Sequence, residues 1–137
     1  MTVFVDGSLQ NATDLHTYNV QSEIVIPNGY ELIAIRCENI GGGEGLLASA
    51  ESYFGELLML SDSTWKCSTV FEEGWNQKDF RASSDNWENA TNIGTKSWSV
   101  SGEISQYARW IWTKERANTI YCRTEFPWRG SNYYYVL

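Results

Sequence analysis

The chain has 137 residues, of which 42% are hydrophobic and 15% aromatic, and its formal net charge is −7. This length fits one domain over 1–137, with enough apolar side chains for a core of its own. An acidic chain repels phosphate backbones and anionic lipid headgroups, which argues against nucleic acid and membrane surfaces as partners. No segment approaches the roughly 18 apolar residues that a membrane-spanning helix needs.

The first part of the chain is typical of short strands separated by turns. Residues 1–8 carry Val at alternate positions and end near an Asp-Gly turn, and 23–26 (EIVI) is predicted as a short strand closed by Pro-Asn-Gly. The clearest strand is predicted at 30–37 (YELIAIRC). Both of its faces are largely apolar, which indicates a central position in a sheet.

The rest of the chain continues this pattern. Further strands are predicted at 46–50, 53–60, 64–69, 109–113, 119–126 and 133–137. The stretch 53–60 (YFGELLML) also scores as helix, but its glycine and its short length favour a strand. Residues 76–92 are polar and predict irregular structure. Many short strands without a convincing amphipathic helix predict an all-β fold, an antiparallel β-sandwich or jelly roll.

Motifs for catalysis and nucleotide binding are weak. The 17 acidic residues supply carboxylate pairs by number alone, so glycoside hydrolysis by two carboxylates is disfavoured. The single histidine, His16, has no nucleophile-elbow motif nearby and offers no zinc site. The glycine-rich stretch 38–45 lacks the nucleotide-loop pattern, and its two Glu would repel phosphate. We therefore expect a protein that is not an enzyme.

Four blocks of sequence, in order, are familiar. They are IRCEN with the glycine loop and LLAS at 35–49, TWKCS at 64–68, a Gly-Trp…Phe…Ser-Ser…Trp…Ala series at 74–90, and ARWIWT with YCR and Phe at 108–126. Together they resemble the galactose-binding-domain-like jelly roll of invertebrate extracellular proteins, and within that group the sea-anemone-type galactose-specific lectins. The third block departs from the usual pattern, because the acidic pair after Phe80 is absent and two residues intervene before Trp87.

The resemblance implies a function as well as a fold. Lectins of this type bind terminal galactose without catalysis, form homodimers and hold the sugar partly through calcium. Calcium takes six to eight oxygen ligands, and the predicted ligands lie in two acidic turn regions: Glu38, Glu44, Asp79 and Asp85. The predicted sugar-binding residues are Trp128, Trp98, Glu44 and Asn39.

Other interpretations stay open beside this one. Asn39 is equally suited to a structural role in the turn that follows its strand. Five tryptophans inside the blocks are expected to serve the core or the sheet edges rather than the ligand: Trp65, Trp75, Trp87, Trp110 and Trp112. The alternative function is an auxiliary or adhesion module of a larger extracellular protein, and a glycoside hydrolase ranks third.

The three cysteines predict one disulfide and one remaining thiol. Cys67 and Cys122 lie within the recognised blocks in strands that can oppose each other, so we expect them to be bridged, although Cys37 also lies within a strand and could pair with either. The cysteines form no CxxC motif, and N-x-[ST] sequons stand at Asn11 and Asn89, which favours a secreted protein. The segment MTVFVDGSLQ lacks the charge and apolar pattern of a signal peptide.

Overall fold

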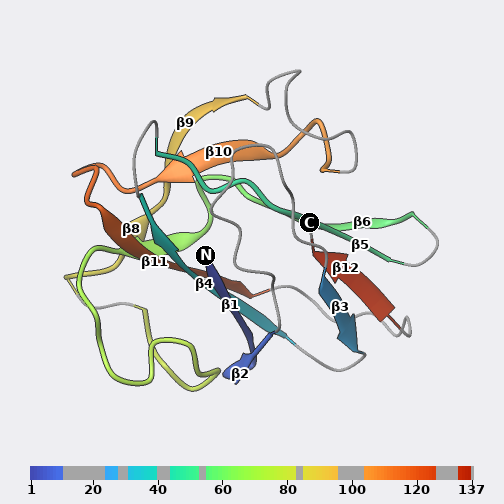
Figure 1. The fold of residues 1–137 in the computed structure, drawn as a ribbon, viewed down its shortest axis with the longest axis horizontal. Helices are drawn as coiled ribbons and strands as arrows, with labels where there is room; N and C mark the ends of the chain where they lie inside the picture. Colours follow the sequence, from blue (N-terminus) through green and yellow to red (C-terminus); the bar gives the residue numbers. More distant parts are fainter. Residues whose placement is uncertain are drawn as a thin grey trace.

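The structure is a computed structural model that describes residues 1–10, 24–27, 31–39, 44–52, 55–82, 85–95, 104–125 and 133–136. The strands in these ranges are β1 (Thr2–Val5), β2 (Ser8–Leu9), β3 (Ile24–Pro27), β4 (Leu32–Glu38), β5 (Ser49–Ser52), β6 (Leu57–Leu60), β7 (Lys66–Ser68), β8 (Glu88–Asn89), β9 (Thr91–Thr95), β10 (Arg109–Trp112), β11 (Thr119–Glu125) and β12 (Tyr133–Val136). These ranges contain no helix, and their strands pair antiparallel (Figure 1). The prediction of an all-β, antiparallel fold is confirmed, and the jelly-roll topology stays a prediction.

The strands form three sheets in the described part of the chain. The largest sheet has the order β2-β1-β4-β11-β7-β8, a second has the order β3-β12-β5-β6, and β10 pairs with β9 (Figure 1). As predicted, β4 is central: it lies between β1 and β11, and its residues from Leu32 to Cys37 are buried except for Arg36, which is half-buried. The apolar character of both faces of this strand is therefore explained by cover on both sides of the sheet.

One face of the largest sheet packs into the main hydrophobic core. Side chains of the sheet, such as Ile33 and Ile35, meet Ala50 and Met59 of the second sheet in one buried cluster. Fully buried Trp65 lies in the same cluster and donates its Nε1–H to the carbonyl of Leu60 at 2.8 Å, which satisfies the indole when it leaves water. The two sheets therefore share a single core.

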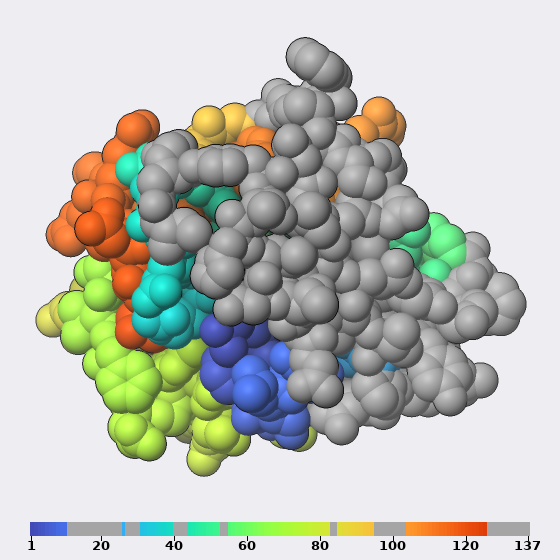
Figure 2. All heavy atoms as spheres, in the orientation of Figure 1, coloured from blue at the N-terminus to red at the C-terminus, as the bar shows by residue number. Residues whose placement is uncertain are grey.

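The opposite face of the largest sheet is covered by the chain between β7 and β8, described over 69–82 and 85–87, which we call the covering segment. Trp75 packs edge-on against Phe4 of β1 and Tyr121 of β11, with ring centroids 5.7 and 5.1 Å away. In the space-filling view this segment (green) lies beside the N-terminal residues (blue) (Figure 2). The predicted framework role of the tryptophans is confirmed for four of them, which are buried: Trp65, Trp75, Trp87 and Trp112.

Several predicted boundaries were wrong. The stretch predicted as irregular contains β8 and the start of β9, which are short and polar. The strand β8 lies at the edge of its sheet with both residues exposed, so its sequence shows no alternation of apolar and polar residues. The strand predicted from Leu46 begins only at Ser49, because Leu46 makes an isolated bridge to Ile111 instead. The strand predicted over 53–60 is seen from Leu57 onward, as a strand and not a helix.

Candidate functional site

A pocket of about 320 Å³ opens over the outer face of the largest sheet, where β7 pairs with β11. Its lining residues are Thr64, Lys66, Phe80, Ala82, Arg123, Thr124 and Glu125. Register places Lys66 directly opposite Arg123, and opposed residues of an antiparallel pair project from the same face of the sheet. The two strands therefore supply the charged floor of this pocket, and the covering segment supplies its apolar wall.

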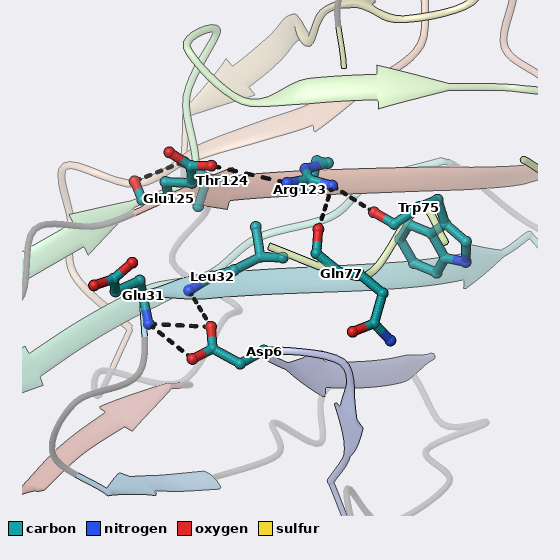
Figure 3. A network of polar contacts seen from close by, with 8 residues as sticks. All are labelled: Asp6, Glu31, Leu32, Trp75, Gln77, Arg123, Thr124 and Glu125. Carbon is teal, nitrogen blue, oxygen red and sulfur yellow. Dashed lines mark hydrogen bonds and ion pairs between the residues drawn. The ribbon is translucent and has the colours of Figure 1, made fainter. Parts of the chain in front are cut away.

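Arg123 is the centre of the site. Its side chain is buried, and Nη1 donates hydrogen bonds to the carbonyls of Trp75 at 2.7 Å and Gln77 at 3.1 Å (Figure 3). The guanidinium carbon lies 5.4 Å from the ring centre of Phe80, and Nη2 lies 3.8 Å from Glu125. One side chain thus joins β11 to the covering segment and also faces the pocket.

The electrostatic setting of this arginine is unusual for a strand residue. Burial lowers the pKa of the Arg123 guanidinium from its ordinary value, while the charges of Glu125 and Asp79 act in the opposite direction. An arginine has so high an ordinary pKa that it keeps its charge in proteins. The sheet therefore holds a buried positive charge beside the pocket.

A second contact fixes the other side of the covering segment. Asp6 accepts hydrogen bonds from the backbone N–H groups of Glu31 at 3.1 Å and Leu32 at 2.8 Å (Figure 3), and Lys78 lies 3.6 Å from its carboxylate. Gly7, at φ +85°, faces Gln77 so closely that a Cβ would meet that side chain at 2.5 Å. The turn after β1 and the segment that carries Phe80 are therefore held together.

The predicted calcium ligands do not come together in this structure. Glu38 pairs with Arg36, and its hydrogen bond raises the pKa of the Arg36 guanidinium. Register places Glu38 opposite Thr119, four residues and about 13 Å along β11 from Arg123, whereas Asp79 acts on Arg123 itself.

The other two predicted ligands are also separate. Glu44 lies 3.9 Å from Arg116, and Asp85 is exposed in the covering segment. Within the described ranges, no group of three or more His, Cys, Asp and Glu side chains is close enough to hold a metal ion. The four predicted residues thus do not fit one calcium shell here.

The predicted sugar-binding residues are only partly within view. Trp98 and Trp128 lie outside the described residues. The backbone N–H of Asn39 donates to the carbonyl of Asn118 at 2.7 Å, which supports a structural role after β4. Glu44 lies with Arg116 and does not line the pocket.

Sequence reasoning missed the residues that do line the pocket. One local signal was present: Arg123 stands in the middle of a predicted strand, where an unpaired charge is expensive to bury. The residue opposite Arg123 in the sheet could not be identified from the sequence, because Lys66 is distant along the chain and lies opposite Arg123 only through the pairing of β7 with β11.

The disulfide lies directly beneath this site. Cys67 is bridged to Cys122 and Cys37 is a buried thiol, so the predicted pairing is confirmed. Each bridged cysteine directly adjoins a charged pocket residue, Lys66 or Arg123. Because successive residues of a strand face opposite ways, the bridge lies in the core and the charges lie on the outer face.

Burial makes Cys37 unreactive in the folded protein. It raises the pKa of the Cys37 thiol to about 12 from an ordinary value of 9.0, and the thiolate is the species that reacts. We expect a thiol reagent at pH 8 to label no cysteine in the folded, oxidised protein and one in denaturant, as measured by mass spectrometry. Rapid labelling without denaturant would contradict this burial.

The same shift predicts how stability changes in alkali. The pKa of Cys37 in the folded protein lies above its ordinary value, so the folded state favours the protonated thiol. The stability that this thiol contributes is complete below about pH 9 and is lost as the pH rises toward about 12, because the unfolded chain then releases the proton more readily. Denaturation curves of the wild type and of Cys37→Ala should therefore converge in alkali. A constant difference in stability between the two proteins over this pH range would show that ionisation of the Cys37 thiol does not affect stability.

No protein-family model matches the chain, and no curated protein or solved structure matches it. In the described part of the chain, no helix is long and apolar enough to cross a membrane. The pocket and the sequence resemblance are therefore the two observations that bear on function.

Proposed function

We propose that the protein is a lectin that binds terminal galactose without catalysis, in the pocket between β7, β11 and the covering segment. The observation that carries the proposal is the lining of this pocket. Thr64 offers a hydroxyl, Lys66 offers donors and Glu125 offers an acceptor beside the ring of Phe80. Sugar sites need such polar groups in fixed positions together with an apolar surface.

The way the pocket is held supports the same proposal. Arg123 fixes the carbonyls of Trp75 and Gln77, and the Cys67–Cys122 disulfide cross-links the two strands that form the floor. A site that is ordered before the ligand arrives avoids part of the entropy cost of binding. A sugar, which binds weakly through its hydroxyls, would bind more tightly to a site that is already ordered.

Further parts of the proposal come from the resemblance. They are a calcium-assisted site, a homodimer that binds glycans at two points, and an extracellular location. The disulfide supports the last of these, because such bonds persist in oxidising compartments. The proposed calcium role comes from the resemblance alone, because among the described residues no group of three or more His, Cys, Asp and Glu side chains could hold a metal ion.

Calorimetric titration with methyl galactoside, with and without a chelator, tests the proposal. We expect binding that Thr64→Val weakens by about fivefold, because one hydroxyl hydrogen bond is lost. Thr119→Val, at the end of β11 away from the pocket, is the control and should bind like the wild type. Undiminished binding in chelator removes the calcium role, and no binding to any galactoside removes the lectin assignment.

Two simple assays distinguish the alternative functions. Agglutination of cells that free galactose inhibits is expected of a dimeric lectin and not of an auxiliary or adhesion module without a sugar site. Release of sugar from galactosides on prolonged incubation would instead indicate a glycoside hydrolase.

A further inference from the structure

Two cations occupy directly paired positions on an acidic protein, with the Lys66 ammonium hydrogen-bonded to Asn89 of β8, on the side of β7 away from β11. Lys66 and Arg123 are direct partners in the pairing of β7 with β11, and like charges in this position destabilise a sheet. The chain carries 17 acidic and 10 basic residues, so the pair does not follow from a generally basic surface. It is most simply explained by a negative group that belongs between the two side chains.

The arginine of this pair has unused hydrogen-bond donors. Its Nη1 serves the carbonyls of Trp75 and Gln77. Its Nη2 lies 3.8 Å from Glu125, which is beyond hydrogen-bond distance. Within the described ranges, neither Nη2 nor Nε donates a hydrogen bond, although an arginine has five N–H groups to place.

The lysine also has donors to spare. Its Nζ donates to the Asn89 side-chain oxygen at 2.6 Å, which uses one of three N–H groups. Both cations line the same pocket. Donors from two directions therefore remain for a ligand.

We propose that Lys66 and Arg123 form a subsite for an anionic group on the sugar, a carboxylate or a sulfate ester, so that acidic galactosides are preferred over neutral galactose. This inference rests on the proposed lectin function and specifies its ligand class. A guanidinium pairs with two oxygens of one anion in its plane, and an ammonium adds a point charge. An anion here would also compensate the burial of Arg123.

Glu125 takes the place of the ligand anion in the unliganded protein. Its side chain is 70% exposed, against 5% for Arg123, and the 3.8 Å separation is long for an ion pair. A contact this exposed is weak, so a ligand anion can displace it at little cost. Glu125 therefore acts as an internal competitor that sets the affinity.

Two charge-neutralising variants test the subsite. Lys66→Gln should weaken binding of an acidic galactoside by about tenfold, because one charged hydrogen bond is lost, and weaken binding of a neutral one less, because glutamine keeps two N–H donors, so the ratio of acidic to neutral affinity should fall. Glu125→Gln should strengthen acidic binding by about threefold, because the competitor is removed. Both positions are accessible enough for the variants to fold, which unfolding curves check.

The controls change the same charges elsewhere. Arg116→Gln and Glu115→Gln lie in the turn between β10 and β11, at the end of β11 away from the pocket, and Arg116 has a 69% exposed side chain. Neither should alter the ratio of acidic to neutral binding. An equal response in the controls would show that net charge, and not the subsite, sets the preference.

The probes are methyl galactoside, galacturonic acid and galactose 6-sulfate, titrated by calorimetry at low and high salt. Tighter binding of either acidic sugar than of the neutral one, lost in Lys66→Gln and reduced by salt, supports the subsite, and the two sugars distinguish carboxylate from sulfate. Equal binding of all three sugars overturns this inference while the lectin function stands. No binding of any sugar overturns the lectin function itself.

Discussion

Replacing Cys67 and Cys122 together with alanine should lower the free energy of unfolding by about 4 kcal/mol. The bridge spans a sequence separation of 55 residues, so it removes a large loop entropy from the unfolded chain. It also joins β7 to β11, the two strands that carry the charged floor of the pocket. The loss should therefore appear as a lower denaturation midpoint in urea.

A matched control is available in the third cysteine. Cys37→Ala also removes a buried sulfur from the core but closes no loop, so it should cost clearly less than the double variant. Reducing agent should destabilise the wild type and leave the double variant unchanged. Equal stability of the double variant and the wild type would show that the bridge contributes nothing to the fold.

Much of the fold could be predicted because the pattern of apolar residues in a strand reflects which of its faces are buried. β4 is apolar on both faces because both are covered, and β1 alternates because its inward Val3 and Val5 are buried while their neighbours are only half-buried. A strand that buries few side chains shows no such pattern of apolar residues. For this reason β8, a two-residue polar strand at a sheet edge, was predicted as irregular chain.

The candidate site was harder to predict, because its charges are brought together by register. Sequence proximity grouped Glu38 with Glu44, yet in the structure these carboxylates pair with Arg36 and Arg116. No local pattern marks Lys66 as the partner of Arg123, since a shift of one residue would turn either side chain to the other face. The Cys67–Cys122 disulfide could be predicted because both cysteines lie within predicted strands that can oppose each other.

Replacing Arg123 with methionine should lower the free energy of unfolding by about 3 kcal/mol and abolish the preference for acidic galactosides. Methionine has nearly the length of the arginine stem but donates no hydrogen bond. The carbonyls of Trp75 and Gln77 would lose their partner, and the first of these bonds is buried. The covering segment would then be held mainly by Trp75 packing and by the contacts of Asp6 and Lys78.

Two further variants separate the stabilising role of Arg123 from its binding role. Arg123→Lys keeps the charge but not the planar group, so it should recover part of the acidic preference and less of the stability, since one ammonium does not match the fork geometry. Gln77→Ala leaves the carbonyl that accepts from Arg123, so it should keep this hydrogen bond and lose only the contact of its side chain with Gly7. Burying a charge costs free energy that an apolar replacement avoids, and some buried ion pairs can be replaced without loss. If Arg123→Met unfolds at the wild-type urea midpoint, the two carbonyl contacts do not stabilise the covering segment, and Arg123 is kept for binding alone.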